Sequence, residues 1–197
     1  MFKVGITGGI GSGKSMLCRH LAQLGASVYY SDAEAKRLMI ENTELKCKIS
    51  ECFGRQAYLD GVLNRAYLAE QVFGDGAKRD QLNALVHPVV RADFHSWAER
   101  QDADYVVMES AILFDACLDC EMDLSVAVLA PEPLRIARAA ARDGVDREQI
   151  TERMAAQMSE ERMSALADYT VVNIIDDELE ASAERLDKII RREAAKN

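Results

Sequence analysis

The chain has 197 residues, of which 49% are hydrophobic and 29% are charged. This size and composition are typical of one globular domain, or of one domain with an insertion, and they exclude a disordered or fibrous chain. The formal net charge of −9 argues against non-specific binding to nucleic acid or to an anionic membrane, because both need a basic surface.

Short segments rich in β-branched and aromatic residues alternate along the chain with segments whose apolar residues recur at helical spacing. The first kind predicts strands over residues 2–7, 27–30, 105–109, 123–129 and 169–172. The second kind predicts helices over residues 14–24, 33–54 with a break near Asn42, 64–73, 77–100, 131–142, 146–166 and 176–195. The alternation predicts an α/β fold, a parallel sheet of about five strands flanked by helices.

The stretch from residue 31 to residue 104 is too long for one crossover helix between two strands. We interpret it as a helical insertion in a single domain whose core comprises residues 1–30, 105–134 and 167–197. Inserted segments on an α/β core commonly shape a substrate site, so we expect the insertion to bind the acceptor of a reaction. Residues 135–166 are expected to form a helical lid.

Residues 5–15 read GITGGIGSGKS and satisfy the pattern GxxxxGK[ST], with a predicted strand before and a predicted helix after. Glycines let backbone N–H groups form an anion-binding concavity, to which the following helix adds its positive end. A flexible glycine turn is the alternative, but the strand and helix context favours a phosphate loop and a P-loop NTPase fold. Lys14 would reach the β- and γ-phosphates, and Ser15 would hold Mg²⁺. The ATP-binding residues predicted here are Gly8, Gly9, Gly11, Ser12, Gly13, Lys14, Ser15 and Met16.

Two acidic residues lie at the ends of predicted strands. Asp32 follows the second strand, where a phosphoryl acceptor would lie, and it could accept the proton of an attacking hydroxyl. The alternative role for Asp32 is a helix N-cap, and position alone does not choose between the two. Glu109 ends the third strand and could order the water shell of a metal, although a carboxylate bound to backbone is an equal alternative there.

Arg135, Arg138 and Arg142 recur at spacings of three and four residues and therefore share one face of a predicted helix. Such a stripe is usually a solvated face. No acidic residue lies between these three arginines, however, which favours contact with an anion. The helical pattern resumes after Gly144, so residues 135–160 could form a hairpin that closes over the phosphates.

The cysteine count and the absence of targeting signals favour the cytoplasm. No apolar run approaches the roughly 20 residues of a membrane span, and the N-terminus has no secretory pattern. Five cysteines, an odd number in a chain of this size, are typical of a reducing compartment. Cys117 and Cys120 have CxxC spacing, but no second ligand pair with matching spacing follows, so we predict no zinc site.

Several motifs together resemble the dephospho-coenzyme A kinase family over essentially the whole chain. They are GITGGIGSGKS, SDA at residues 31–33, LDGVLNR at 59–65, LVHPVVR at 85–91, RDG at 142–144 and ITERMAAQ at 150–157. Two departures are SAILFD, where many members read PLLFE, and Ile174 and Ile175, where a glycine often follows the asparagine. The first leaves Asp115 without an expected role.

The resemblance implies a role for several further residues. Asp32 would be the catalytic base, and Arg142 would be a lid arginine that contacts the phosphates beside Lys14. Arg138 would contact ATP, and Asn173, in ADYTVVN, would lie beside the adenine. The acceptor side would be lined by Asp32, Arg65, His87 and Arg91.

The expected reaction is transfer of the γ-phosphoryl group of ATP to the 3′-hydroxyl of dephospho-coenzyme A, with Mg²⁺ required. The expected partners are ATP and dephospho-CoA, without nucleic acid or membrane, and the expected state is a monomer, with a homo-oligomer left open. The alternative is a P-loop kinase for another small acceptor, such as a nucleotide. A guanine nucleotide switch should carry NKxD and a transport ATPase should carry LSGGQ, and neither string occurs in the sequence.

Overall fold

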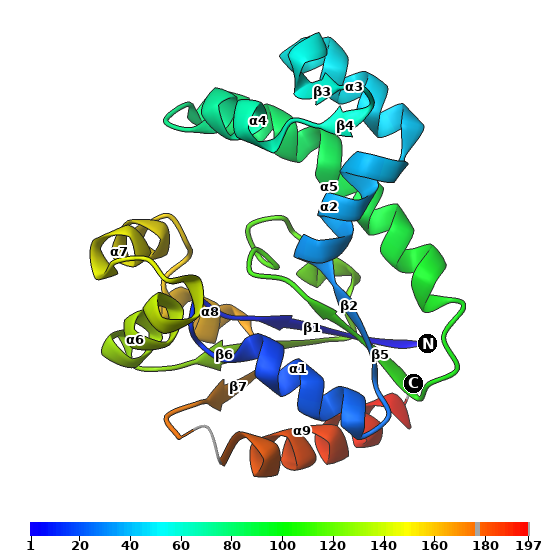
Figure 1. Ribbon diagram of the computed structural model, residues 1–197. Coiled ribbons are helices and arrows are strands. Elements are labelled where there is room, and N and C mark those ends of the chain that lie inside the picture. Colours follow the sequence, from blue (N-terminus) through cyan, green and yellow to red (C-terminus); the bar gives the residue numbers. More distant parts are fainter. Residues whose placement is uncertain (176–177, 197) are drawn as a thin grey trace. The chain divides into compact units, whose positions relative to one another are not determined.

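Figure 1 shows the fold as a computed structural model, which describes residues 1–175 and 178–196. The chain divides into two compact units. The first comprises Met1–Tyr30 and Ala98–Asn197, and the second comprises Ser31–Trp97. The expected insertion over residues 31–104 therefore extends beyond the second unit, because residues 98–104 belong to the first.

A five-stranded parallel sheet forms the centre of the first unit, in the order β2-β5-β1-β6-β7. The central strands β1, β5 and β6 are almost entirely buried, as expected for a parallel sheet with helices on both faces. The strands are β1 (Phe2–Thr7), β2 (Ser27–Tyr30), β5 (Tyr105–Glu109), β6 (Leu124–Leu129) and β7 (Tyr169–Val172). The predicted fold class is confirmed.

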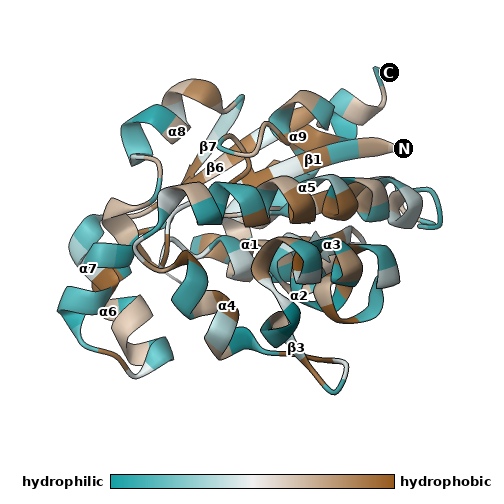
Figure 2. Cartoon of the chain, turned by 90° about the horizontal axis from the view of Figure 1, so that it is seen from above, coloured by the Kyte–Doolittle hydropathy of each residue, from teal (hydrophilic) through white to brown (hydrophobic). Residues whose placement is uncertain are grey.

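Helices α1 and α9 of the first unit pack on this sheet and share one apolar core with it. In Figure 2 the brown, hydrophobic residues run through the strands, whereas α7 is largely teal. Leu17 and Leu21 of α1 and Leu186 and Ile190 of α9 join β1, β5 and β6 in that core. The helices are α1 (Lys14–Gln23), α6 (Glu132–Asp143), α7 (Arg147–Ala155), α8 (Glu160–Leu166) and α9 (Leu179–Ala194), with a short 3₁₀ turn η2 (Asp119–Glu121). Residues 176–177, where the last predicted helix begins, lie outside the described part of the chain.

The helix predicted over residues 146–166 is two helices, so that prediction is wrong. The first ends at Ala155, and the second begins at Glu160 after Ser159. The Ser159 hydroxyl accepts a hydrogen bond from the Arg162 backbone N–H, so it caps α8 and starts a new helix. A capping serine can therefore divide a segment into two helices even where apolar residues continue at helical spacing.

The second unit, all of whose residues the structure describes, contains four α-helices, one short 3₁₀ turn and one small hairpin. Asn42 separates α2 from α3 as an N-cap, because its side chain accepts a hydrogen bond from Leu45 N, so the break predicted near this residue is confirmed. Arg37 of α2 binds Asp93 of α5 at 2.9 Å and so ties these two helices together. The elements are α2 (Ser31–Glu41), α3 (Thr43–Phe53), η1 (Arg55–Ala57), β3 (Tyr58–Leu59), β4 (Val62–Leu63), α4 (Arg65–Val72) and α5 (Gly76–Ala98).

The β3–β4 hairpin was not predicted, although the sequence carries a signal for it. Asp60 and Gly61 form its two-residue turn, with φ angles of 50° and 81°. Asp-Gly is a favoured pair for this turn because both positions need positive φ.

Across the described residues, the structure contains no helix long and apolar enough to cross a membrane.

Candidate active site

The loop between β1 and α1 ends at Gly13, which has a φ of 96° and stands at the N-terminus of α1. A side chain there would be strained by the left-handed backbone and would overlap the side-chain amide of Asn173. Among the described residues, no side chain caps the N-terminus of α1, and the first turn of this helix holds no acidic residue. The backbone N–H groups and the positive end of the helix dipole are therefore available to an anion.

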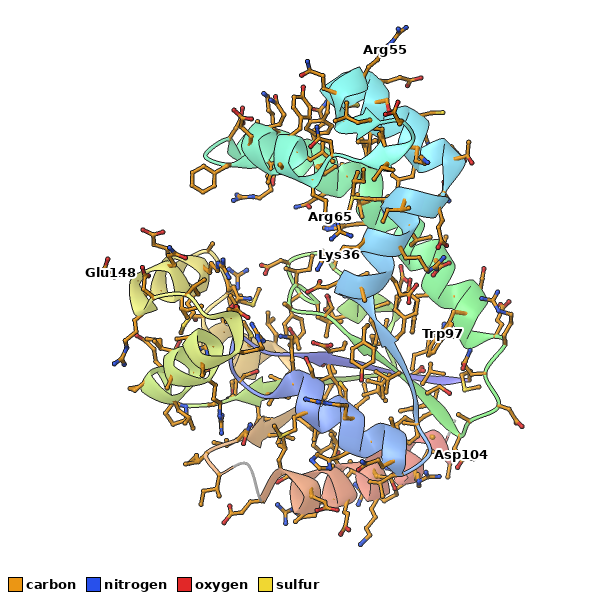
Figure 3. All side chains as sticks on the ribbon, in the orientation of Figure 1. Lys36, Arg55, Arg65, Trp97, Asp104 and Glu148 are labelled. Carbon is orange, nitrogen blue, oxygen red and sulfur yellow. The ribbon has the colours of Figure 1, made fainter. Side chains whose placement is uncertain are left out.

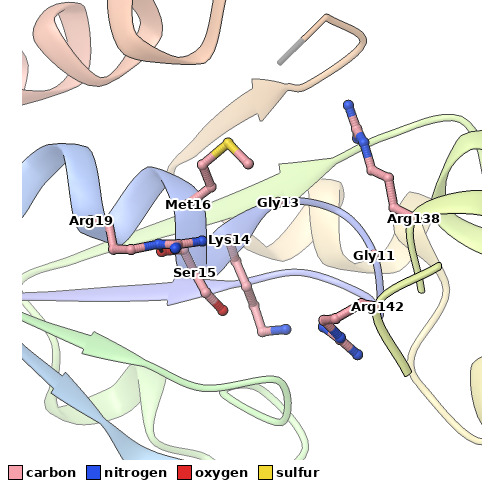
Figure 4. Close-up of a pocket in the computed structure, with 8 residues that line it drawn as sticks. All are labelled: Gly11, Gly13, Lys14, Ser15, Met16, Arg19, Arg138 and Arg142. Carbon is pink, nitrogen blue, oxygen red and sulfur yellow. Dashed lines mark hydrogen bonds between the residues drawn. The ribbon is translucent and has the colours of Figure 1, made fainter. Parts of the chain in front are cut away.

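A pocket of about 250 Å³ lies at this helix terminus and is lined by four cationic side chains. Among the described residues, its lining contains no acidic group. In Figure 4, Lys14 and Arg142 extend to the same side of the loop. The complete lining is Gly11, Gly13, Lys14, Ser15, Met16, Arg19, Arg138 and Arg142. In a protein of net charge −9, this is a local site for a polyanion.

Glu109 lies at the carboxyl end of β5 and binds the two polar residues that begin α1. The Ser15 hydroxyl donates a hydrogen bond to Glu109 Oε1 at 3.1 Å, and Lys14 Nζ lies 3.7 Å from the same oxygen. The Lys14 and Glu109 side chains are only 14% and 12% exposed. The parallel pairing of β1 and β5 brings these residues together, since both strands end at the same edge of the sheet.

The three arginines of α6 have different surroundings. Arg142, in the last turn, is 63% exposed and pairs with Asp143, which raises its pKa. Arg138 donates hydrogen bonds to the Asn173 backbone oxygen at 3.2 Å and to its Oδ1 at 3.4 Å. Arg135 is buried and does not line the pocket, because its guanidinium binds the Ile10 backbone oxygen and Glu160. The expectation that all three contact an anion is therefore wrong for Arg135.

Some residues predicted to bind ATP lie outside the pocket lining. Asn173 is buried, and its Nδ2 donates to the Ser12 backbone oxygen at 2.9 Å. Ser12 itself is fully buried. A Cβ on Gly8 would meet the Val128 backbone, and one on Gly9 would overlap Arg135. Direct contact of these four residues with ATP stays a prediction.

The predicted acceptor residues all belong to the second unit. Asp32 is exposed and is the second residue of α2, which begins at Ser31, so it lies inside the first turn instead of preceding the helix as an N-cap. Arg65 begins α4, and Figure 3 labels it. His87 and Arg91 of α5 are four residues apart and share one helix face.

His87 has a lowered pKa, first because it is partly buried and second because the Arg91 charge opposes its protonation. His87 binds a proton more tightly in the unfolded chain than in the folded protein. The free energy of unfolding should therefore fall as the pH drops through about 6.5. We expect this fall, measured by urea unfolding between about pH 7.5 and 5.5, to be smaller in His87→Gln than in the wild type. Identical pH dependence in both proteins would contradict the expectation.

Arg19 lines the pocket but was not among the site residues predicted from the sequence. It lies one helical turn after Ser15, and its Nε donates to the Ser15 backbone oxygen at 3.2 Å. The spacing of four residues from a loop residue was the available signal. The described residues contain no cluster of three or more His, Cys, Asp or Glu side chains that could hold a metal.

Comparison with known proteins identifies the family. The family model described as dephospho-CoA kinase matches residues 2–177. The dephospho-CoA kinase of Salinibacter ruber is 46% identical over 177 residues, which cover 88% of this chain and 89% of the relative. That of Porphyromonas gingivalis is 40% identical over 174 residues, which cover 88% and 86%.

Solved structures show the same fold. A crystal structure from Thermus thermophilus matches with a TM-score of 0.84 and 34% identity, covering 94% of this chain and 95% of its own. The dephospho-CoA kinase of Campylobacter jejuni matches with a TM-score of 0.60 and 20% identity, covering 95% and 96%. A shikimate kinase from Acinetobacter baumannii gives 0.58 at 18% identity, covering 96% and 93%. With nearly its whole length matched by the family model and by close relatives, the chain belongs to the dephospho-CoA kinase family.

Proposed function

We propose specific residue roles for the reaction of this family, the ATP-dependent phosphorylation of dephospho-CoA that completes CoA biosynthesis. The observation that carries the proposal is the cationic pocket of about 250 Å³ at the N-terminus of α1. The phosphates of ATP occupy it, held by backbone N–H groups of the loop and by Lys14. The γ-phosphoryl group is transferred to the 3′-hydroxyl of dephospho-CoA.

Arg138 and Arg142 are the arginines of α6 that contact the phosphates. Both line the pocket, and Arg142 is exposed enough to reach a ligand. Phosphoryl transfer has a loose transition state with charge spread over the phosphoryl oxygens, so fixed cations contribute more than a proton acceptor. Residues 135–166 act as the lid that carries these arginines.

Ser15 and Glu109 are the residues that would hold Mg²⁺. A hydroxyl and a carboxylate 3.1 Å apart are the oxygen donors that Mg²⁺ prefers, and this ion usually completes its shell with substrate phosphates and water. The bound ion would neutralise charge on the β- and γ-phosphates. Because Glu109 Oε1 also lies 3.7 Å from Lys14 Nζ, the same carboxylate orients this lysine.

Asp32 is the base that orients the acceptor hydroxyl and finally takes its proton. Its exposed carboxylate, in the first turn of α2, supports this role because a group that meets a substrate must be accessible. Arg65, His87 and Arg91 bind the acceptor, which carries phosphate groups that suit arginine side chains. Asn173 supports ATP binding through the loop, since its amide holds Ser12.

We place the enzyme in the cytoplasm as a monomer. All five cysteines are free, which fits a reducing compartment.

Incubation with ATP, Mg²⁺ and a panel of acceptors tests the function. Dephospho-CoA should yield ADP and CoA, while nucleoside monophosphates and shikimate should not. Omission of Mg²⁺ should abolish turnover. Efficient phosphorylation of another acceptor, with none of dephospho-CoA, would support the alternative kinase.

A further inference from the structure

Ile10 is the one large apolar residue of the phosphate loop GGIGSG, and its side chain packs away from the core of the sheet. It packs against a small separate core formed by Ile136 and Ala139 of α6 and Ile150 of α7. That core holds the α6–α7 hairpin together. The phosphate loop is therefore joined by apolar packing to the segment that carries Arg138 and Arg142.

Both backbone polar groups of Ile10 are bound by side chains from the same segment. Its N–H donates to Gln157 Oε1 at 2.8 Å, and its carbonyl oxygen accepts from Arg135 Nε at 3.0 Å. The Ile10 N–H is thus committed to the protein and is not among the groups left to bind phosphate. Each side chain instead fixes the orientation of one peptide group in the loop.

Arg135 is itself held in place. Its Nη1 lies 3.0 Å from Glu160 Oε1, and that oxygen also accepts a hydrogen bond from Ala130 N at 3.2 Å. The guanidinium lies so close to Gly9 that a Cβ there would overlap Nη2. Gly9 does not have a positive φ, so its backbone would accept other residues. The space taken by Arg135, and not the backbone conformation, requires glycine at this position.

We infer that Ile10, Arg135 and Gln157 form an anchor that sets the shape of the phosphate loop and fixes its position relative to Arg142. Arg135 and Arg142 are seven residues apart on α6, which is two helical turns, so fixing one end of the helix on the loop positions the other. These three are positioning residues. The inference rests on the proposed function, because it concerns how the same ATP site is assembled.

The anchor differs from ordinary core packing. Arg135 and Gln157 also line an open cavity of about 520 Å³, so water can replace a side chain removed there. Substitutions should therefore reduce ATP binding and turnover more than they reduce stability. A purely structural role would lower the melting temperature without a selective effect on ATP.

The first test replaces Gln157 by methionine, which keeps the length of the side chain but removes the acceptor for Ile10 N–H. We expect ATP affinity, measured by calorimetry, to fall about tenfold, because the hydrogen bond that fixes the orientation of the Ile10 peptide group is lost and a mobile water does not restore that orientation. The KM for dephospho-CoA should stay within about twofold. Gln157→Glu, which keeps an acceptor oxygen, should recover most of the affinity.

The matched control is Gln149→Met, which makes the same change at an exposed position of α7. It should leave ATP affinity and both kinetic constants unchanged. If Gln157→Met binds ATP as tightly as the control does, the anchor is wrong.

A second test uses Gly9→Ala, Arg135→Met and the double variant. Each single change should weaken ATP binding. The double variant should be no weaker than the worse single one, because the methionine that replaces Arg135 leaves room for the new Cβ. Glu160 stays 24% exposed and hydrated without its partner, so Arg135→Met should fold, which circular dichroism will check. Additive losses would show that the two positions act independently and would overturn the inference.

The two proposals can fail separately. If the wild type binds ATP but does not phosphorylate dephospho-CoA, the proposed reaction is wrong, while the ATP affinities of the variants still test the anchor. If the reaction is observed and Gln157→Met and Gly9→Ala bind ATP normally, the anchor alone is rejected.

Discussion

Replacing Arg142 by alanine is expected to lower kcat for dephospho-CoA phosphorylation by about 10³- to 10⁵-fold, the range for an arginine that stabilises a transferring phosphoryl group. Arg142 lines the cationic pocket, and the three other cationic side chains of the lining, Lys14, Arg19 and Arg138, are anchored at other positions and do not take its place. Its side chain is 63% exposed and pairs with the adjacent Asp143, so its loss should barely change stability. Steady-state kinetics and circular dichroism measure both effects.

Arg147→Ala is the matched control for this prediction. Arg147 is also an exposed arginine of the lid segment, at the start of α7, but it does not line the pocket. It should retain wild-type kcat. If Arg142→Ala kept more than about a tenth of the wild-type kcat, the role of Arg142 as a phosphate-binding lid residue would be wrong.

The phosphate loop was predictable from the sequence because every part of it is local. Glycine spacing, a strand before and a helix after fix the backbone, and Lys14 and Ser15 follow directly at the helix N-terminus. The pairing of Glu109 with Ser15 was less accessible. It depends on which strands are neighbours in the sheet, and the sequence predicted strands without their order.

The role of Arg135 could not be predicted from helical spacing alone. It shares a face with Arg138 and Arg142, so the three look equivalent in the sequence. The partner of Arg135 is a backbone oxygen 125 residues away, and that of Gln157 is a backbone N–H 147 residues away. Such contacts leave no local signal. Gly9 is an indirect sign of this contact, because glycine is required there by the Arg135 side chain, which is distant in the sequence.

The prediction of helix boundaries was wrong where a polar capping side chain sets the boundary. The apolar period continued through residues 146–166, but Ser159 ended it by capping a new helix. The opposite held at Asn42, where the break was predicted and a cap explains it. Capping residues inside a periodic segment therefore carry as much information as the period itself.

The proposed role of Asp32 is tested by replacing it with asparagine. We expect Asp32→Asn to lower kcat for dephospho-CoA by about 10²- to 10⁴-fold, because the variant loses the negative charge that orients the hydroxyl and accepts its proton. Asparagine has nearly the same size, and Asp32 is exposed in the first turn of α2. Losing its favourable interaction with the helix dipole should cost about 0.3–1 kcal/mol of stability.

The ATP affinity of Asp32→Asn distinguishes between the possible roles of Asp32. The pocket at the N-terminus of α1 is lined by residues of the first unit, whereas Asp32 belongs to the second, so affinity for ATP should stay within a few-fold of the wild type. Asp102→Asn, the same substitution at another exposed position, is the control and should alter neither measurement. Near-normal phosphorylation by Asp32→Asn would reduce this residue to a charge that favours the start of α2. Lost ATP binding would move its role from the acceptor to the metal. A large fall in kcat with ATP affinity preserved supports Asp32 as the base, because the loss then falls on the step in which the acceptor hydroxyl is oriented and gives up its proton.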